Sequence, residues 1–494
     1  MKKEKKKYWQ DIEYILKNTW KHGRIMYLWI ILSGISHTVI SLLGVYLPVI
    51  TVSGLENHWS IKNLLIVIFI FTFLLALFNF IKAKTDSNYS VTQEVSRYRY
   101  LRACNKKIMT CDYFKFENPK MQVKIDQVGD LVYTGASNVG INGIQNNLKS
   151  LITTLLGSFT YIAILKSLGL VIIILRLVNA VGYYWFSGNA DIYAHENRES
   201  WSVIDKKISY INDKLTRNEF AKDIRNYNCI EWLMKKLNSL IFERSKWFKK
   251  VQRKKTSNEL YKSGLGLAID IGVFAYIIYM VIDNQITVAQ FVLYWGSANQ
   301  LSGFFDGVFN SLSKLRAASL DVSVIRSFLD DDNKKVDKET SDRGIKDMDV
   351  SQGISIRFEH VYFKYYNADS YTIKDFNTTI KAGEKISLVG MNGAGKTTLI
   401  KLLCGFYKPS KGNIYINDIA IDEISKENMV SFISAVFQDS IILPFSVAQN
   451  IALTPNEDIN HARVHKCIET AGLGERLKDV NLPLVKAAHE EGIE

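Results

Sequence analysis

The chain has 494 residues, of which 47% are hydrophobic and 22% charged, and its formal net charge is +13. This length exceeds one ordinary domain, so we expect two or more. The positive charge alone would permit nucleic-acid binding, but no nucleic-acid recognition motif accompanies it. Basic residues gather instead in Met1–Arg24 and beside long apolar runs, which is typical of membrane topology. We therefore expect contact with membrane lipid and no nucleic-acid partner.

Six apolar stretches precede residue 310, and most come near the roughly 20 residues that a helix needs to cross a bilayer. The candidate spans are about Ile25–Val52, Leu64–Ile81, Ser150–Leu168, Gly169–Phe186, Gly264–Ile282 and Ile286–Phe309. The first begins too late after the basic N-terminus, and is too long, for a cleaved signal peptide. We expect it to be an uncleaved membrane span.

The segments between these spans alternate between short links and long, basic stretches. The long stretches are Lys82–Lys149 and Ser187–Ser263, and both are rich in Lys and Arg. The positive-inside rule places them, both termini and the C-terminal domain in the cytosol. Their apolar spacing predicts membrane helices that continue into the cytosol and reverse near Asp112–Pro119 and Thr216–Lys222. We expect a multi-pass protein of the cytoplasmic membrane.

Charged residues inside the apolar runs are costly, so a functional role is the first hypothesis for them. Arg176 and Asp270 could form an ion pair between the fourth and fifth spans, or contact a substrate, or lie where a span limit is misplaced. We expect Lys166 to extend toward water at an outer turn. His37 is expected to be a packed core residue. None of the five cysteines forms a C-x-x-C motif, so we expect reduced thiols.

A charged stretch, residues 330–352, predicts a linker, and Ile354–Phe358 alternates as a strand that opens the next domain. Gly390-Met-Asn-Gly-Ala-Gly-Lys-Thr397 then fits G-x-x-x-x-G-K-[ST], the P-loop. Ile386, Leu388 and Val389 predict a short buried strand before it, and apolar residues at helical spacing follow it. A glycine-rich surface turn is the alternative, which this context disfavours. The P-loop predicts that Lys396 binds nucleotide phosphates and that Thr397 holds Mg²⁺.

The whole pattern resembles an ABC exporter half-transporter, from about Ile12 to the last residue. Val361-Tyr-Phe-Lys-Tyr365 is similar to the family's A-loop, which implies that Tyr365 stacks on adenine, with Tyr366 as the alternative. Phe432–Gln438 resembles the strand that leads to the Q-loop, which implies that Gln438 helps hold Mg²⁺. Ser446–Ile451 resembles the family's T-V-x-x-N-I run. Ala221–Asn228 looks like the segment that docks onto a nucleotide-binding domain.

The resemblance implies a specific site, fold and partner. The cofactors are ATP and Mg²⁺, and the metal ligands are Thr397 and Gln438. The nucleotide-binding residues are Tyr365, Gly390, Asn392, Gly393, Ala394, Gly395, Lys396, Thr397, Thr398 and Gln438. We expect residues 1–329 to form an α-helical six-span membrane domain, and residues 353–494 the N-terminal part of an α/β P-loop NTPase domain. The implied partner is a second half-transporter, identical or different.

The sequence departs from the family after Gln438. We find no L-S-G-G-Q signature, no Walker B strand ending in Asp-Glu and no switch histidine, and His489, Glu490 and Glu491 do not replace them. We therefore expect a chain truncated before the signature, with no general base and slow or absent ATP hydrolysis. One hypothesis is an exporter subunit with an unidentified substrate. The other is a non-catalytic ATP-binding membrane subunit that regulates or scaffolds a partner. Lipids, peptides and amphipathic drugs stay possible substrates, whereas the expected lack of a leading peptidase domain disfavours leader-cleaving peptide export.

Overall fold

The structure is a computed structural model that describes residues 2–484, except 134, 136, 138, 168–169, 217, 331–352, 367, 425–427, 430–432, 439–441 and 478. The chain divides into two compact units, Met1–Val336 and Asp337–Glu494. Almost all of the predicted linker lies outside the described residues, as do His489, Glu490 and Glu491. The two units are described separately below.

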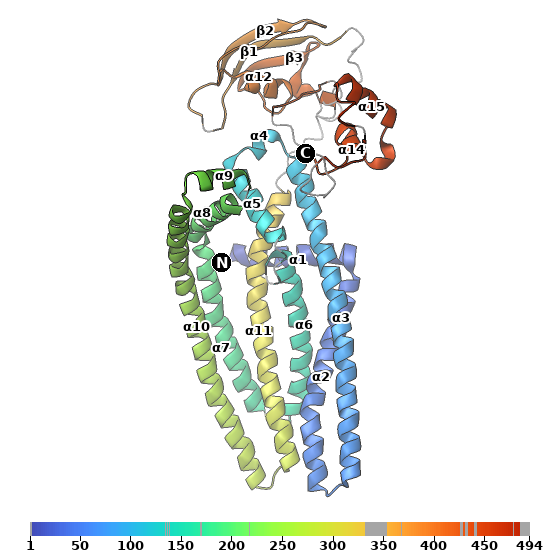
Figure 1. Ribbon diagram of the computed structural model, residues 1–494. Coiled ribbons are helices and arrows are strands. Elements are labelled where there is room, and N and C mark those ends of the chain that lie inside the picture. Colours follow the sequence, from blue (N-terminus) through green and yellow to red (C-terminus); the bar gives the residue numbers. More distant parts are fainter. Residues whose placement is uncertain are drawn as a thin grey trace. The chain divides into compact units, whose positions relative to one another are not determined.

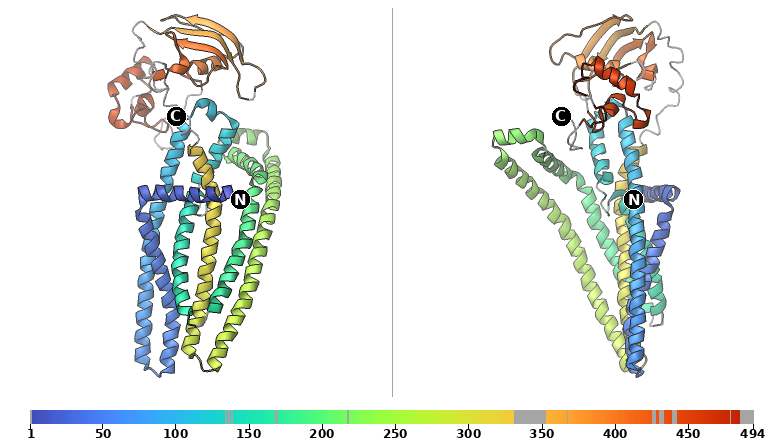
Figure 2. Two further views of the ribbon diagram at one scale, coloured as in Figure 1. Left: turned by 180° about the vertical axis from the view of Figure 1, so that it is seen from behind. Right: turned by 45° about the vertical axis from the view of Figure 1, so that its right-hand side comes forward.

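The first unit is entirely helical in its described residues. Its helices are α1 (Lys2–Gly23), α2 (Ile25–Glu56), α3 (Ile61–Thr110), α4 (Tyr113–Phe116), α5 (Pro119–Tyr133), α6 (Gly140–Leu165), α7 (Leu170–Glu196), α8 (Arg198–Thr216), α9 (Asn218–Asn226), α10 (Ile230–Ile282) and α11 (Val288–Asp330). The six predicted apolar runs fall in α2, α3, α6, α7, α10 and α11. Figures 1 and 2 show these six helices running alongside one another, with α1 lying across them.

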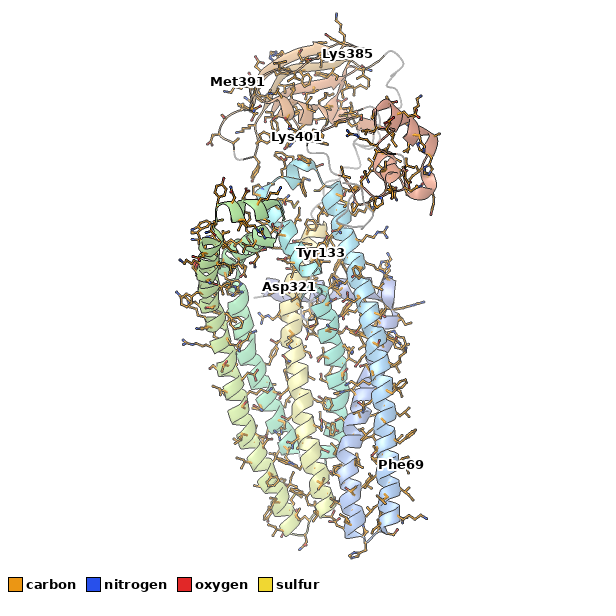
Figure 3. The ribbon with its side chains drawn as sticks, in the orientation of Figure 1. Phe69, Tyr133, Asp321, Lys385, Met391 and Lys401 are labelled. Carbon is orange, nitrogen blue, oxygen red and sulfur yellow. The ribbon has the colours of Figure 1, made fainter. Side chains whose placement is uncertain are left out.

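Within the described residues, four helices are long and apolar enough to cross a membrane: α2, α3, α6 and α10. Helix α7 contributes a shorter apolar stretch, Leu170–Gly182, and α11 does not reach the same level of hydropathy. Many apolar side chains of these helices face outward, as Phe69 does on α3 (Figure 3). In their described residues, four of these six helices are long and apolar enough to cross a membrane, so the six-span topology stays a prediction.

Among the described residues, two large apolar cores and a smaller cluster of Met26, Ile30 and Tyr89 hold the helical unit together. One joins α1, α3, α5, α6 and α11, and the other joins α2, α6, α7, α10 and α11. In the second core, α6 packs closely on α11 because Gly157 leaves room for the ring of Phe304. A Cβ atom at Gly157 would lie only 2.4 Å from that ring. The Phe304 ring also stacks on Tyr161 at a centroid distance of 5.7 Å.

The two long basic segments are helical in their described residues, as their apolar spacing predicts. Helix α3 continues from its apolar part to Thr110, and the chain then reverses through α4 before α5 begins at Pro119. The second reversal lies between α8 and α10 and contains the short helix α9, which carries most of the segment Ala221–Asn228. Both reversals therefore confirm the turns that the sequence predicts.

The second unit contains a four-stranded sheet in the order β2-β1-β3-β4. Its strands are β1 (Ile356–Phe363), β2 (Ile373–Ile380), β3 (Lys411–Ile416) and β4 (Ile419–Ala420), and neighbouring strands pair antiparallel. Its α-helices are α12 (Lys396–Leu403), α14 (Val447–Ala452) and α15 (His461–Thr470), with one-turn 3₁₀ helices at Ile421–Glu423 and Asn456–Asp458. Strand β1 confirms the strand expected after the linker, although it begins and ends later than predicted.

The predicted buried strand before the P-loop is not formed, so this prediction was wrong. Residues 384–390 have no regular secondary structure, and the side chains of Ile386 and Val389 are 50% and 93% exposed. A strand needs a hydrogen-bonded neighbour to satisfy its backbone groups. No described strand pairs with this segment, and its apolar alternation alone cannot supply one.

Candidate nucleotide site

The aromatic residue predicted to meet adenine lies just beyond strand β1. The burial of Phe363 anchors the end of the strand, and the amide of Thr372 donates to the Phe363 carbonyl at 2.8 Å, which closes the loop that follows. Tyr365 lies in this loop, where its ring meets Phe363 and Tyr407 edge to face at 5.1 and 5.6 Å. The neighbouring Tyr366 is more exposed. These contacts hold Tyr365 in a defined position.

The P-loop itself has the backbone that its glycines permit. Gly393 and Gly395 have φ values of +83° and +91°, a left-handed conformation that other residues adopt only with strain. Gly395 caps helix α12 and lies against the Thr372 carbonyl, which would be 3.4 Å from an added Cβ atom. The loop therefore lies beside the segment that carries Tyr365. Its curled backbone and the start of α12 form the type of surface that binds phosphate.

The first side chains of helix α12 divide between the solvent and the interior. The ammonium group of Lys396 donates to the carbonyls of Gly390 and Met391 at 2.5 and 2.8 Å, so it spans the loop. Thr397 is exposed, whereas Thr398 is only 4% exposed and its Oγ1 lies 2.8 Å from the Tyr365 hydroxyl. Nothing in the sequence spacing of Tyr365 and Thr398 indicates this bond, so it could not be predicted.

Four other predicted residues, Gly390, Asn392, Gly393 and Ala394, lie on the exposed side of the loop. Figure 3 labels Met391 in the same loop. The structure therefore brings together Tyr365, the P-loop and both threonines within one compact arrangement.

The residue before Gln438, Phe437, fixes where this part of the chain lies. Phe437 stacks on Phe406, which follows α12, at a centroid distance of 5.8 Å. Gln438 itself is exposed at a bend, and no contact with Thr397 is seen among the described residues. Residues 432–438 were expected to enter the Q-loop as a strand, but the described residues 433–437 are not a strand, so that prediction was also wrong. Shared binding of Mg²⁺ by Gln438 and Thr397 stays a prediction.

Ser446 and Asn450, two positions of the run that resembles T-V-x-x-N-I, stabilise the next loop through hydrogen bonds. Ser446 caps helix α14 in a capping box with Gln449, accepting from the Gln449 amide at 3.2 Å. Asn450 closes the preceding turn: its Nδ2 donates to the carbonyls of Leu443, Phe445 and Ser446, and its Oδ1 accepts from the Leu443 amide. Both residues therefore shape this loop locally.

The charges inside the helical unit pair as one hypothesis expected. Arg176 of α7 forms an ion pair with Asp270 of α10, and the Arg176 side chain is only 1% exposed. His37 is half-buried and packs edge to face on Phe304, so it contacts the core from its margin. Lys166 lies exposed at the end of α6, as expected for a turn.

The donor set at the P-loop fits a nucleoside triphosphate. Backbone amides, the Lys396 ammonium and the Thr397 hydroxyl would hold the phosphates and the bound Mg²⁺, and Tyr365 stands beside them for a base. Bound Mg²⁺ would neutralise part of the phosphate charge. Within the described part of the chain, no aspartate or glutamate bonds to the P-loop residues.

Comparison with known proteins agrees with this site. The ABC transporter family model matches residues 373–484. The subtilin transport ATP-binding protein SpaT of Bacillus subtilis is 25% identical over 356 residues, which cover 72% of this chain and 56% of that protein. An ATP-dependent lipid A-core flippase of Ralstonia nicotianae is 35% identical over 132 residues, 26% of this chain and 22% of that protein. The mesentericin-Y105 transport/processing protein MesD of Leuconostoc mesenteroides is 27% identical over 44% of this chain and 30% of its own length. The chain thus spans about half, or less, of the curated relatives it matches.

The fold has a similar counterpart among solved structures. A bacterial Atm1-family ABC exporter with ATP bound superimposes with a TM-score of 0.69 and 17% identity, covering 93% of this chain and 80% of that one. At this identity the likeness concerns the fold. Residues 373–484 thus match the ABC transporter family, and the fold of the chain resembles that of an exporter in which a helical membrane-type domain is fused to an ATP-binding domain.

Proposed function

We propose that this chain is one subunit of an ATP-driven exporter in the cytoplasmic membrane, acting with a second half-transporter and with both termini in the cytosol. The observation that carries the proposal is the P-loop, with Lys396 spanning it and Thr397 exposed at the start of α12. The helical unit supports it with four helices of membrane-spanning length. The transported substrate is unassigned at this level, because relatives carry names that refer to subtilin, glucan and lipid A-core.

In the proposed mechanism, ATP binding at the P-loop draws two nucleotide domains together, and this movement is passed to the spanning helices. Lys396 would hold the β- and γ-phosphates and Thr397 would bind Mg²⁺, while Tyr365 would fix the adenine. The proposal assigns ATP binding to this chain and names no general base in it.

A second candidate function is ATP binding without hydrolysis, in a subunit that regulates or scaffolds a partner. It is favoured by one observation, the lack of a carboxylate bonded to the P-loop among the described residues. An exporter uses ATP to move its substrate, whereas the alternative subunit only binds ATP, so one experiment separates the two functions.

The test uses inside-out membrane vesicles that contain the full chain, supplied with a panel of lipid, peptide and amphipathic small-molecule substrates. The exporter proposal expects ATP-dependent accumulation of one class, lost in a Lys396→Met variant. ATP binding with no accumulation and no ATP turnover, also after candidate half-transporters are co-expressed, would support the regulatory alternative instead. Absence of ATP binding would contradict both.

A further inference from the structure

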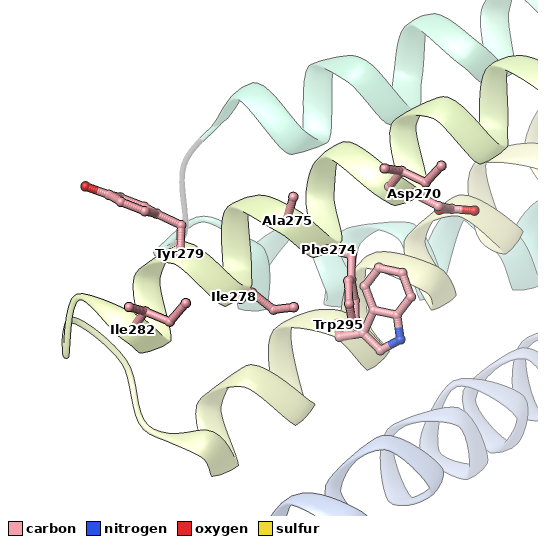
Figure 4. Close-up of a pocket in the computed structure, with 8 residues that line it drawn as sticks. Asp270, Phe274, Ala275, Ile278, Tyr279, Ile282 and Trp295 are labelled. Carbon is pink, nitrogen blue, oxygen red and sulfur yellow. The ribbon is translucent and has the colours of Figure 1, made fainter.

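A groove of about 650 Å³ lies along the C-terminal part of helix α10, far in the chain from the nucleotide site. Figure 4 shows its wall: Phe274, Ile278 and Tyr279 project from α10, and Trp295 projects from the neighbouring helix α11. The rings of Phe274 and Trp295 meet edge to face at 4.9 Å. Apart from one residue, the groove is lined by apolar and aromatic side chains.

That residue is Asp270, which lies at one end of the groove (Figure 4) and is the one carboxylate among the described residues that line it. Its Oδ1 is buried on the side of Arg176, yet 43% of the Asp270 side chain is exposed. A carboxylate accepts through two oxygen atoms, so pairing on one side leaves acceptor capacity on the other. The groove is therefore an apolar surface with an accessible acceptor at its end.

Arg176 explains why a charge can persist at this position. A charge among apolar helices is costly unless it is paired, and the ion pair with Arg176 supplies that partner for Asp270. Arg176 is itself almost fully buried behind Asp270 and does not line the groove. It therefore acts as a fixed counter-charge, while Asp270 is the group that a ligand in the groove can reach.

These features together favour one class of ligand. An apolar wall favours a hydrophobic body, aromatic rings attract a cation, and a carboxylate pairs with one. An anion of the same shape would meet the Asp270 carboxylate, and a neutral lipid chain would gain nothing from it. We propose that the groove between α10 and α11 binds an amphipathic cation, with its charge at Asp270 and its apolar part against Phe274, Ile278 and Trp295.

The inference deepens the proposed export function, because it names the substrate class that the helical unit would take. Binding itself does not depend on ATP, so it can be tested apart from transport. A matched control is available in the same unit: Asp86 of α3 pairs with Lys149 of α6 at 2.6 Å but does not line the groove.

The test measures equilibrium binding of two nearly isosteric probes, tetraphenylphosphonium and tetraphenylborate, to the full chain in lipid nanodiscs. Binding to empty nanodiscs is subtracted. We expect the cation to bind about tenfold more tightly than the anion, and Asp270→Asn to reduce cation affinity by about tenfold. Asp270→Glu, which keeps the charge, should retain the preference, and Asp86→Asn should leave cation affinity unchanged.

Several results would overturn the proposal. Equal binding of both probes would make the groove a general apolar surface, occupied by lipid or by a second copy of the chain. An equal loss in Asp86→Asn would assign the effect to overall charge. Because Asp270→Asn leaves Arg176 without this partner, thermal unfolding of the variant in nanodiscs serves as its folding check, and Asp270→Glu keeps the test decisive if the Asn variant fails to fold. Selective binding without ATP-driven transport would refute the export function and leave the site standing.

Discussion

Replacing Tyr365 tests how the nucleotide site recognises the base. Tyr365 is held between Phe363 and Tyr407, and its hydroxyl lies 2.8 Å from the buried Thr398 Oγ1. Stacking of a base on an aromatic ring is worth about 1–3 kcal/mol, so Tyr365→Ala should raise the Kd for ATP by roughly 5- to 150-fold. Competition with a fluorescent ATP analogue on the purified full chain measures this change.

The hydroxyl and the ring can be separated. Tyr365→Phe keeps the ring, so ATP affinity should change by no more than about twofold, because stacking does not use the hydroxyl. It leaves Thr398 Oγ1 without its partner, which should lower the free energy of unfolding by about 1–3 kcal/mol. The double variant Tyr365→Phe with Thr398→Val removes both partners and should recover part of that loss. Denaturant unfolding followed by tryptophan fluorescence measures the stability.

Tyr366 provides the control, since it is the alternative base partner. Tyr366→Ala should leave ATP affinity near that of the unchanged chain. The reasoning is refuted if Tyr366→Ala weakens ATP binding and Tyr365→Ala does not, or if Tyr365→Phe weakens it as much as Tyr365→Ala.

Three further predictions concern stability and reactivity. Replacing Asp270 by Asn should cost about 3–5 kcal/mol, because the Arg176 charge stays buried without its partner, and exchanging the two residues should restore part of the loss in a thermal unfolding assay. Asn450→Ala removes four hydrogen bonds around the turn before α14, whereas Ser446→Ala removes only the helix cap, at a cost of about 1 kcal/mol. Asn450→Ala should therefore lower the stability of this segment more than Ser446→Ala. Hydrogen exchange of residues 443–452 measures both losses, and equal exchange rates in the two variants would contradict this ranking. Burial raises the pKa of the Cys404 thiol, so less thiolate is present at neutral pH. Maleimide labelling, read by mass spectrometry, should therefore be slower at Cys404 than at the exposed Cys467, and the labelling rate of Cys404 should rise more steeply as the pH increases. Equal labelling rates at the two cysteines would contradict this prediction.

The sequence predicts the helical unit well because its signals are local. Long apolar runs and basic flanks locate α2, α3 and α10, and the high cost of a lone charge makes the Arg176–Asp270 pair one of three alternatives, which the structure selects. The P-loop is equally readable, since its glycines and Lys396 have fixed spacing.

What could not be predicted depends on contacts between distant residues. The apolar run around Ile386 and Val389 has the pattern of a buried strand, but pairing decides whether a strand forms, and no described segment pairs with it. The bond between Tyr365 and Thr398 requires the P-loop to lie beside the loop after β1. The groove likewise depends on the position of Trp295 of α11 against α10, and the periodicity of neither helix predicts that position.

The most direct test of the account is ATP binding by the full chain with Lys396→Met and Lys401→Met compared. Both variants remove one positive charge from helix α12, but Lys396 spans the P-loop whereas Lys401 lies in the last turn of the helix, near the ring of Tyr407. Loss of a charged hydrogen bond to phosphate costs about 1.5–3 kcal/mol, so Lys396→Met should raise the Kd for Mg²⁺–ATP by roughly 10- to 150-fold. Lys401→Met should leave the Kd within about twofold of the unchanged chain. Equal Kd values for the two variants, or no ATP binding by the unchanged chain, would contradict the central claim.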